Sequence, residues 1–431
     1  MNQIDSGREK TLWRDRLFVP YWFARTTSLS GTSVTTVILP MLVYQETRSP
    51  LLTSMLTAFE VLPYLAFGLV AGVASDRVDR FRLMIGCDLV SGLLVVTLPV
   101  AAELRLRSWA HVLIVALALA TCFVWFDAAN FGAIRSIVGR DRVVSAMSAI
   151  WTSEQLANVG GPLLAGLLIV LVGVAQSLFV DTASYFISAL LLTVVWRRHR
   201  GLQAPASTAA AERSGKGVRS EIADGLRFIW ADHLIRAITL SSLGVSIAGG
   251  AVVGLLVVFA NRALHIAPSS NRIALLFAAL AFGAAIASVS SPVLSRRFRA
   301  GRLALAGTGM NFVALVCIAA SGSLWIVLAP LVAYQFCYST VTLNGIVLRQ
   351  MCTPQRLVGR VSTTARMIGW GGMPLGATLG GLLATVLAVR WVLAGMSLLV
   401  LAAFLWGLRS DLLTSPVVTG RPESLPLASE A

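Results

Sequence analysis

The sequence predicts an all-α integral membrane protein with twelve transmembrane helices, arranged as two pseudo-symmetric halves of six. Its composition, the length of its apolar runs and an internal repeat lead to this fold class. Of the 431 residues, 56% are hydrophobic and 13% are charged, and the mean hydropathy is +0.78. Soluble domains carry about a quarter charged residues. The apolar runs are too long and continuous for the strands of a membrane barrel.

Each predicted span is an apolar run of about 20 residues or more, which is the length that crosses a bilayer. The first half (18–196) contains spans at 18–44, 51–75, 83–103, 110–133, 145–171 and 177–196. The second half (235–408) contains spans at 235–260, 271–294, 302–321, 325–348, 361–387 and 390–408. A polar N-terminal tail (1–17), a central linker (197–234) and a C-terminal tail (409–431) complete the chain.

The distribution of basic residues predicts the orientation, because short cytoplasmic loops retain arginine and lysine. If the N-terminus is cytoplasmic, the outer loops hold six of the 35 basic residues and two lie within spans. The six are Arg48, Arg105, Arg107, Arg262, Arg272 and Arg390. All others then fall in cytoplasmic segments, so both termini are expected inside, in a multi-pass protein of the plasma membrane.

The central linker has two parts. Residues 203–211 are small and polar and predict a flexible connection. Ile222, Leu226 and Ile229 share one face of a predicted amphipathic helix, which we expect on the inner membrane surface.

The two halves repeat a pattern of residues at a constant offset. Asn130-x4-Arg135-x6-Arg142 returns, shifted by 214 residues, as Asn344-x4-Arg349-x6-Arg356. The spans that follow each copy carry Pro162 and Pro374 in similar contexts. Parallel six-span repeats around a central cavity are typical of a large class of transporters.

The loop between spans two and three combines small residues with charges. Gly68 and Gly72 have the spacing that lets membrane helices approach closely. Asp76-Arg77-Val-Asp79-Arg80 follows them. The tendency of short cytoplasmic loops to retain arginine explains Arg77 and Arg80 but not the two aspartates between and beside them.

With twelve spans in two halves, a long central loop and Gly68-x3-Gly72-x3-Asp76-Arg77, the chain resembles the major facilitator superfamily. Further motifs are similar to the branch of enterobactin exporters and macrolide efflux pumps. They are Pro40-x3-Tyr44, Leu62-Pro63, Gly161-Pro162 and Pro354-x4-Gly359-Arg360-Val361.

The resemblance implies a conformational latch between the halves. Its aspartate, Asp76, would cap the cytoplasmic start of span eleven and so favour the outward-facing state, since a carboxylate is stabilised at a helix N-terminus. Arg77, Arg80 and Arg135 would surround it, with Gly68 and Gly72 forming the close approach. The second copy of the motif keeps arginines but has no carboxylate, so the latch is expected in the first half alone. A purely topological role of these charges is the alternative.

Four ionisable residues lie well inside predicted spans, where each is costly without a partner or a cavity: Arg25, Glu60, Glu154 and Arg366. The resemblance implies that spans two and eleven face each other, as do spans five and eight. We therefore hypothesise that Glu60 and Arg366 form an inter-domain pair that breaks and reforms, which leaves Glu154 for proton coupling or a cationic substrate. A static buried pair is the alternative. Asp88, Asp127 and Asp181 are assigned a structural role.

The run from Gly369 to Pro374 predicts a deformable helix beside a binding site, with Trp370, Gly371 and Pro374 as candidate cavity residues. Gly161 and Pro162 are the candidates of the first half. Tight helix packing is the competing explanation.

Several other functions are not supported by the sequence. The chain has no Walker A motif for ATP, no metal-ligand spacing and no basic face for nucleic acid, and its five cysteines show no pairing pattern. No enzymatic activity and no cofactor are expected.

We therefore expect a secondary active transporter, working as a monomer, that exports a lipophilic or amphiphilic small molecule by alternating access coupled to protons. A drug, an antibiotic or a siderophore would fit. The alternatives are an importer or lipid-moving facilitator on the same fold, and a transport-dead membrane receptor.

Overall fold

The computed structural model describes residues 12–410, apart from residues 76, 140, 201–225 and 355–356. The described residues form helices, turns and loops and contain no strand. The predicted all-α class is thereby confirmed. Helices form because a backbone inside a bilayer must pair its own N–H and C=O groups.

The first half consists of six long helices. They are α2 (Phe18–Thr47), α3 (Pro50–Ser75), α4 (Arg80–Glu103), α5 (Trp109–Val138), α6 (Val143–Val172) and α7 (Leu178–Arg200). The second half contains α9 (His233–Gly254), α10 (Leu256–Arg262), α11 (Arg272–Arg297), α12 (Ala300–Ala320), α13 (Leu324–Cys352), α14 (Val358–Val386) and α15 (Val389–Leu408).

Eleven helices in the described part of the chain are long and apolar enough to cross a membrane. The remaining predicted span corresponds to α14, which is 29 residues long and packs against α3 and α9. Ten of the twelve predicted spans start within two residues of the observed helices; those at 83 and 361 start three residues late.

The seventh span was predicted as one continuous helix, but the structure shows it interrupted. α9 ends at Gly254, and Leu255 separates it from α10. The segment from the start of α9 to the end of α10 is displaced by 215 residues from α2 at both ends, so Leu255 is equivalent to Pro40. Proline lacks the N–H that continues a helix, so both halves have an irregularity at this position.

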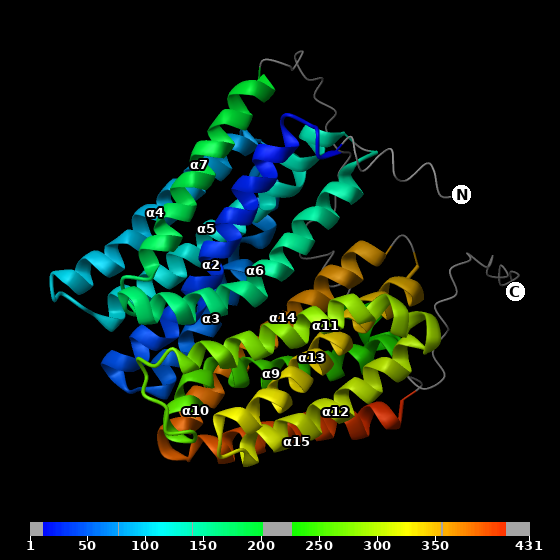
Figure 1. Cartoon of the computed structure of the whole chain (residues 1–431). Helices are drawn as coiled ribbons and strands as arrows, with labels where there is room; N and C mark the ends of the chain where they lie inside the picture. The colour runs from blue at the N-terminus through cyan, green and yellow to red at the C-terminus, as the bar shows by residue number, and fades with distance from the viewer. Residues whose placement is uncertain (1–11, 76, 140, 201–225, 355–356, 411–431) are drawn as a thin grey trace, which may run out of the picture.

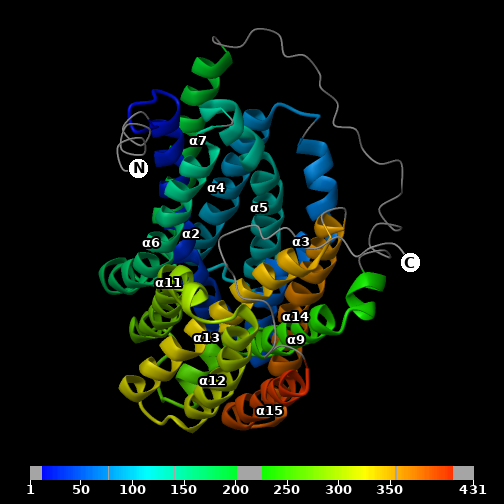
Figure 2. The same ribbon diagram turned by 90° about the vertical axis from the view of Figure 1, so that its right-hand side faces the viewer.

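The two halves form separate bundles, with the blue-to-green helices above the green-to-red helices in Figure 1 and again after the rotation in Figure 2. In the first bundle α2 contacts α5, α6 and α7, and α4 contacts α5 and α7. In the second, α9 packs against α14 and α15, and α13 against α11 and α12.

The two main helix pairs that join the bundles are α3 with α14 and α6 with α11; α9 and α10 add smaller contacts with α3, and α10 with α2. The two main pairs are those implied by the resemblance. The bundles meet most closely where α2 ends, and their helices diverge toward the side where α2 begins and α15 ends (Figure 1).

The end of the central linker is helical over residues 226–231, and Ile222 lies outside the described residues. Ile229 is buried with Ile235 of α9 and with Val361 and Ala365 of α14. Leu226 is exposed. The expected apolar face thus packs partly on the second half, because that bundle offers apolar partners of its own.

Candidate functional site

Asp79 forms the start of α4. Its Oδ1 accepts hydrogen bonds from the backbone N–H groups of Phe81 (3.0 Å) and Arg82 (3.2 Å), and its Oδ2 accepts one from the indole Nε1 of Trp196 on α7 (2.9 Å). An aspartate at this position satisfies N–H groups that have no partner within the helix. One of the two aspartates in the loop therefore has a structural role, which its place just before an apolar run could have indicated.

The loop between α3 and α4 borders a cavity of about 470 Å³ beside α5, lined by Gly72, Ser75, Arg80, Gly132 and Arg135 among others. A Cβ on Gly132 would overlap the Arg80 side chain, so the glycine makes room for it. The Ser75 hydroxyl donates to the carbonyl of Ala128 on α5 (3.3 Å). The structure thus brings together Gly72, Arg80 and Arg135 of the predicted latch.

The remaining latch residues are more dispersed. Arg77 is exposed, and a Cβ on Gly68 would contact only the ring of Tyr64 in its own helix. Asp76 lies outside the described residues. The latch contact itself therefore stays a prediction.

Arg25 is the most buried of the four predicted interior charges, with 6% of its surface exposed. Its guanidinium lies 4.5 Å from the ring centroid of Phe126 on α5. Glu154 on α6 is half-buried. The preceding residue, Ser153, accepts a hydrogen bond from Trp22 Nε1 of α2 (2.9 Å), which joins the two helices beside Glu154.

Glu60 and Arg366 are not brought together in this conformation. The rings of Tyr64 on α3 and Trp370 on α14 lie 5.0 Å apart, centroid to centroid. Glu60 is one turn before Tyr64, Arg366 is one turn before Trp370, and the two helices run antiparallel. The carboxylate and the guanidinium therefore lie on opposite sides of the aromatic pair, about 12 Å apart along the axes. Helical side chains lean toward their own N-terminus, so these two lean apart.

The candidate cavity residues fall into two groups. Trp370 is 40% exposed, and the position of a Cβ on Gly371 is open. Pro374, one turn further along α14, is half-buried. In the first half, Pro162 is buried and a Cβ on Gly161 would overlap Ser33 of α2. Gly161 and Pro162 thus lie in tight helix packing, which was the competing explanation.

Two buried carboxyl groups in the first half have partners that the sequence did not predict. Asp88 on α4 is 2% exposed and Asp181 on α7 is fully buried. Ser188 Oγ donates to Asp88 Oδ2 (2.6 Å), and both Thr35 and Ser184 donate to Asp181. Periodicity does not reveal such groups, because a membrane helix is apolar on every side.

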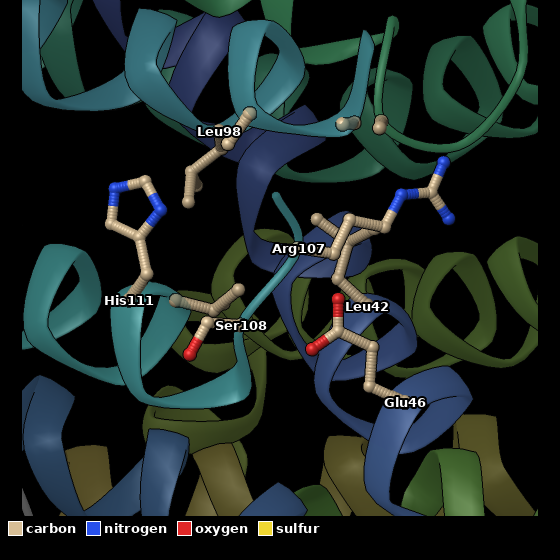
Figure 3. A pocket seen from close by; sticks show the side chains of 10 residues that line it. Leu42, Glu46, Leu98, Arg107, Ser108 and His111 are labelled. Atoms are coloured by element: carbon tan, nitrogen blue, oxygen red, sulfur yellow. The ribbon is translucent and has the colours of Figure 1, made fainter. Parts of the chain in front are cut away.

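A small pocket of about 20 Å³ lies at the end of the first bundle where α2 ends, between α2, α4 and α5. Figure 3 shows Glu46 and His111 entering it from different sides, with Arg107 and Ser108 between them. The His111 ring is within hydrogen-bond distance of the Thr97 hydroxyl (2.8 Å).

The described residues contain no group of three or more His, Cys, Asp or Glu side chains that could hold a metal ion. All five cysteines are free thiols.

Two bundles of six membrane helices, related by a repeat and joined through α3 with α14 and α6 with α11, define a major facilitator transporter. The chain belongs to the transmembrane secretion effector family, whose profile matches residues 11–420. It is therefore a multi-pass membrane transporter.

Related proteins cover almost the whole chain. The multidrug efflux pump Tap of Mycolicibacterium fortuitum is 28% identical over 410 residues, which are 91% of this chain and 97% of that protein. The enterobactin exporter EntS of Shigella boydii (strain Sb227) is 25% identical over 397 residues, 90% of each chain. The resemblance to the enterobactin exporter branch is thereby confirmed.

Solved structures confirm the fold. A bacterial homologue of the human lysosomal transporter Spinster, inward-facing and unoccupied, superposes with a TM-score of 0.69 at 15% identity and covers 93% of this chain and 98% of that one. The nucleoside transporter NupG superposes with a TM-score of 0.70 at 11% identity, covering 91% and 98%.

Proposed function

We propose that this protein is a proton-coupled exporter that moves a lipophilic or amphiphilic small molecule outward across the plasma membrane by alternating access. The observation that carries the proposal is the similarity to the efflux pump Tap over 91% of the chain. A match of that extent includes both bundles and the helix pairs between them, so it concerns the whole transport machinery.

The contacts between the bundles support alternating access. At the end where α2 finishes, Tyr44 donates to Asn261 Oδ1 (3.1 Å) and Gln45 donates to the carbonyl of Pro268 (3.1 Å). Arg262 Nη2 of α10 donates to the carbonyl of Arg48, which follows α2 (3.5 Å). With the termini in the cytoplasm, this closed end is the outer one, and the conformation is inward-facing.

The Tyr64–Trp370 pair supports a lipophilic substrate. It lies where α3 and α14 meet at mid-length, and Gly371 leaves open space beside it. Apolar pockets with aromatic walls are typical of small-molecule sites. A substrate in this position would contact both bundles and so sense their relative movement.

The latch is part of the proposal. Two contacts define the antiparallel register of α3 against α14: a Cβ on Gly381 would overlap Ser54, and Tyr64 contacts Trp370. Extending this antiparallel register along both helices brings Ser75, the last residue of α3, level with the first turn of α14 at Val358. An aspartate following Ser75 is then well placed to cap α14 when the cytoplasmic ends of the two helices close. The interaction of an exposed carboxylate with a helix N-terminus stabilises the capped state by about 0.3–1 kcal/mol.

Efflux of ethidium from cells that express the wild type, Asp76→Asn or Asp127→Asn tests the proposal, with and without a protonophore. We expect extrusion that collapses with the protonophore, is lost in Asp76→Asn and is retained in Asp127→Asn, whose carboxylate is exposed on α5.

Other results would point elsewhere. Extrusion that persists without a proton gradient would contradict coupling, and accumulation of ethidium would indicate an importer. Well-expressed wild type that neither extrudes nor accumulates any of a panel of lipophilic dyes and siderophores would favour a lipid-moving facilitator or a receptor.

A further inference from the structure

The interior of the first bundle contains a cavity of about 40 Å³ between α2, α4, α5 and α7, with several polar side chains in a largely apolar wall. Its wall includes Arg25, Thr32, Asp88, Cys122 and Tyr185. A cavity of this volume holds one to a few water molecules, provided that polar groups surround them. Ionisable groups at this depth are functional candidates by default.

Asp88 is the acidic group of this cavity. It is 2% exposed, lies eight residues into α4, and accepts a hydrogen bond from Ser188 of α7. One hydroxyl donor leaves most of the acceptor capacity of a carboxylate unused. The group therefore has room to gain a proton or a water.

Arg25 is the cationic group of the same cavity. It is 6% exposed, and its Nε is buried without a hydrogen-bond partner among the described residues. Its guanidinium stacks on Phe126, and it forms no ion pair within 4.0 Å in the described part of the chain. A ring face compensates a buried charge only in part. A carboxylate across the cavity would compensate it further.

Other polar and titratable groups surround Asp88. Across the cavity, Thr32 of α2 and Tyr185 of α7 lie within hydrogen-bond distance through their hydroxyl oxygens (3.0 Å). Cys122 lines the cavity from α5. Among the titratable groups near Asp88, Arg25 is the cationic one; the others are Tyr21, Cys87, Cys122, Asp181 and Tyr185.

We propose that Asp88 is the binding site of the coupling proton, in a buried cavity that it shares with the Arg25 guanidinium. With Asp88 ionised, the cavity holds two opposite charges and is neutral. With Asp88 protonated, the cavity holds the cation alone, and Glu154 of α6 is the carboxyl group that remains near Arg25. The lost compensation disfavours the conformation in which that cation is buried. The proton thereby shifts the equilibrium between conformations, since it binds one of them better.

This inference rests on the proposed function and assigns the coupling proton to Asp88, where the sequence had suggested Glu154. Glu60 is exposed and Glu154 is half-buried. Asp88 is nearly sealed, with a counter-charge and a water-sized space beside it, and therefore meets the requirements of a reversible proton site more closely.

The test uses purified full-length protein in vesicles of phosphatidylethanolamine and phosphatidylglycerol, with ethidium as the probe. For one proton exchanged per ethidium, a gradient of about one pH unit sustains about a tenfold accumulation ratio. We expect this ratio in the wild type and in Asp127→Asn, and no accumulation in Asp88→Asn. Asp88→Asn still equilibrates ethidium down its own gradient, which a misfolded variant does not.

Infrared difference spectra between acid and alkaline buffer provide a readout without any substrate. We expect a protonated-carboxyl band in the wild type and in Asp127→Asn that is absent from Asp88→Asn. If Asp88→Asn does not fold, Asp88→Glu replaces it. Driven accumulation with a displaced pH profile then supports the site, whereas a profile equal to that of the wild type overturns it.

The outcomes separate the two proposals. Accumulation by Asp88→Asn equal to that of the wild type, with the band intact, overturns Asp88 as the site and leaves proton-coupled export standing. A wild type that ignores the pH gradient overturns the proposed coupling, and the coupling role of Asp88 with it.

Discussion

Polar side chains inside this protein obtain their partners from neighbouring helices. Tyr21 donates to the side chain of Asn130, and Asp79 joins the start of α4 to Trp196 of α7. Each bond specifies the rotation of one helix against another, which apolar packing alone defines weakly.

Asp79 gives a prediction for stability. We expect Asp79→Ala to lower the free energy of unfolding by about 1 kcal/mol, because two backbone N–H groups of α4 lose their acceptor. Asp79→Asn should cost less, since asparagine is an equally good cap. Thermal unfolding of the purified protein in detergent measures both.

The control is Trp196→Phe, which removes the indole donor but leaves the cap. If Asp79→Ala unfolds at the wild-type temperature, the cap does not stabilise α4.

At the scale of helices, small residues determine how closely neighbours approach. A Cβ on Gly161 would overlap Ser33 of α2, whereas the position of a Cβ on the adjacent Gly160 is open. Between lipid tails no hydrophobic effect drives helices together, so close contact is the main attraction.

The adjacent glycines make a matched pair of substitutions. We expect Gly161→Ala to destabilise the protein by about 1–3 kcal/mol, since the added methyl group forces α2 and α6 apart. Gly160→Ala should stabilise it by about 0.5–1 kcal/mol through helix propensity. Melting curves of the two variants compare them directly, and equal shifts would contradict the packing in the structure.

Glu60 and Arg366 provide a test of the register between α3 and α14. A double-mutant cycle with Glu60→Gln and Arg366→Gln should be additive in the free energy of unfolding within about 0.5 kcal/mol, as for separated sites. The two side chains lie on opposite sides of the Tyr64–Trp370 contact.

A coupling energy well above that value would show that the pair forms in another populated conformation. The inter-domain pair hypothesised from the sequence would then return as part of the cycle.

At the scale of the whole molecule, the two bundles are held together at one end by few polar contacts. Arg262 of α10 contributes one of them, to the carbonyl of Arg48 in the loop after α2 (3.5 Å). Because Arg262 is exposed, water competes for this bond.

Arg262 therefore gives a prediction for the conformational equilibrium. We expect Arg262→Gln to shift it by about 0.5 kcal/mol, roughly twofold, toward the state in which this end is open, because the bond to Arg48 is lost. Hydrogen–deuterium exchange should then rise at residues 44–50 and 380–388.

Arg272→Gln, a change of an exposed arginine at the same end, should leave the exchange unchanged. A rise in both variants would attribute the effect to net charge, and a rise in neither would show that the bond from Arg262 to Arg48 does not hold this end closed.

Much of this architecture could be predicted from the sequence, because bilayer thickness sets the length of every span. The observed helices extend the predicted ones by a turn or so where they continue into polar loops, as at Val138 of α5. The interruption at Leu255 was not predicted, since no proline or charge marks it.

The candidate site was less predictable than the fold. The sequence identified Arg25 as a charge within a span, and Arg80 and Arg135 through the loop motif. It did not reveal the helix rotations that place Asp88 opposite Arg25 or that separate Glu60 from Arg366. Those rotations depend on packing between helices that are apolar all round, which leaves no periodic signal to read.

The meeting of Ser54 with Gly254 and Gly381 has a mechanical consequence. A Cβ on either glycine would contact Ser54, so three slender residues from α3, α9 and α14 interlock where the bundles join. The dispersion attraction at such a contact is short-ranged, and a gap of about 1 Å forfeits up to about half of it. The contact therefore favours a fully closed joint between α3, α9 and α14, and even a slight separation of the three helices there weakens it steeply.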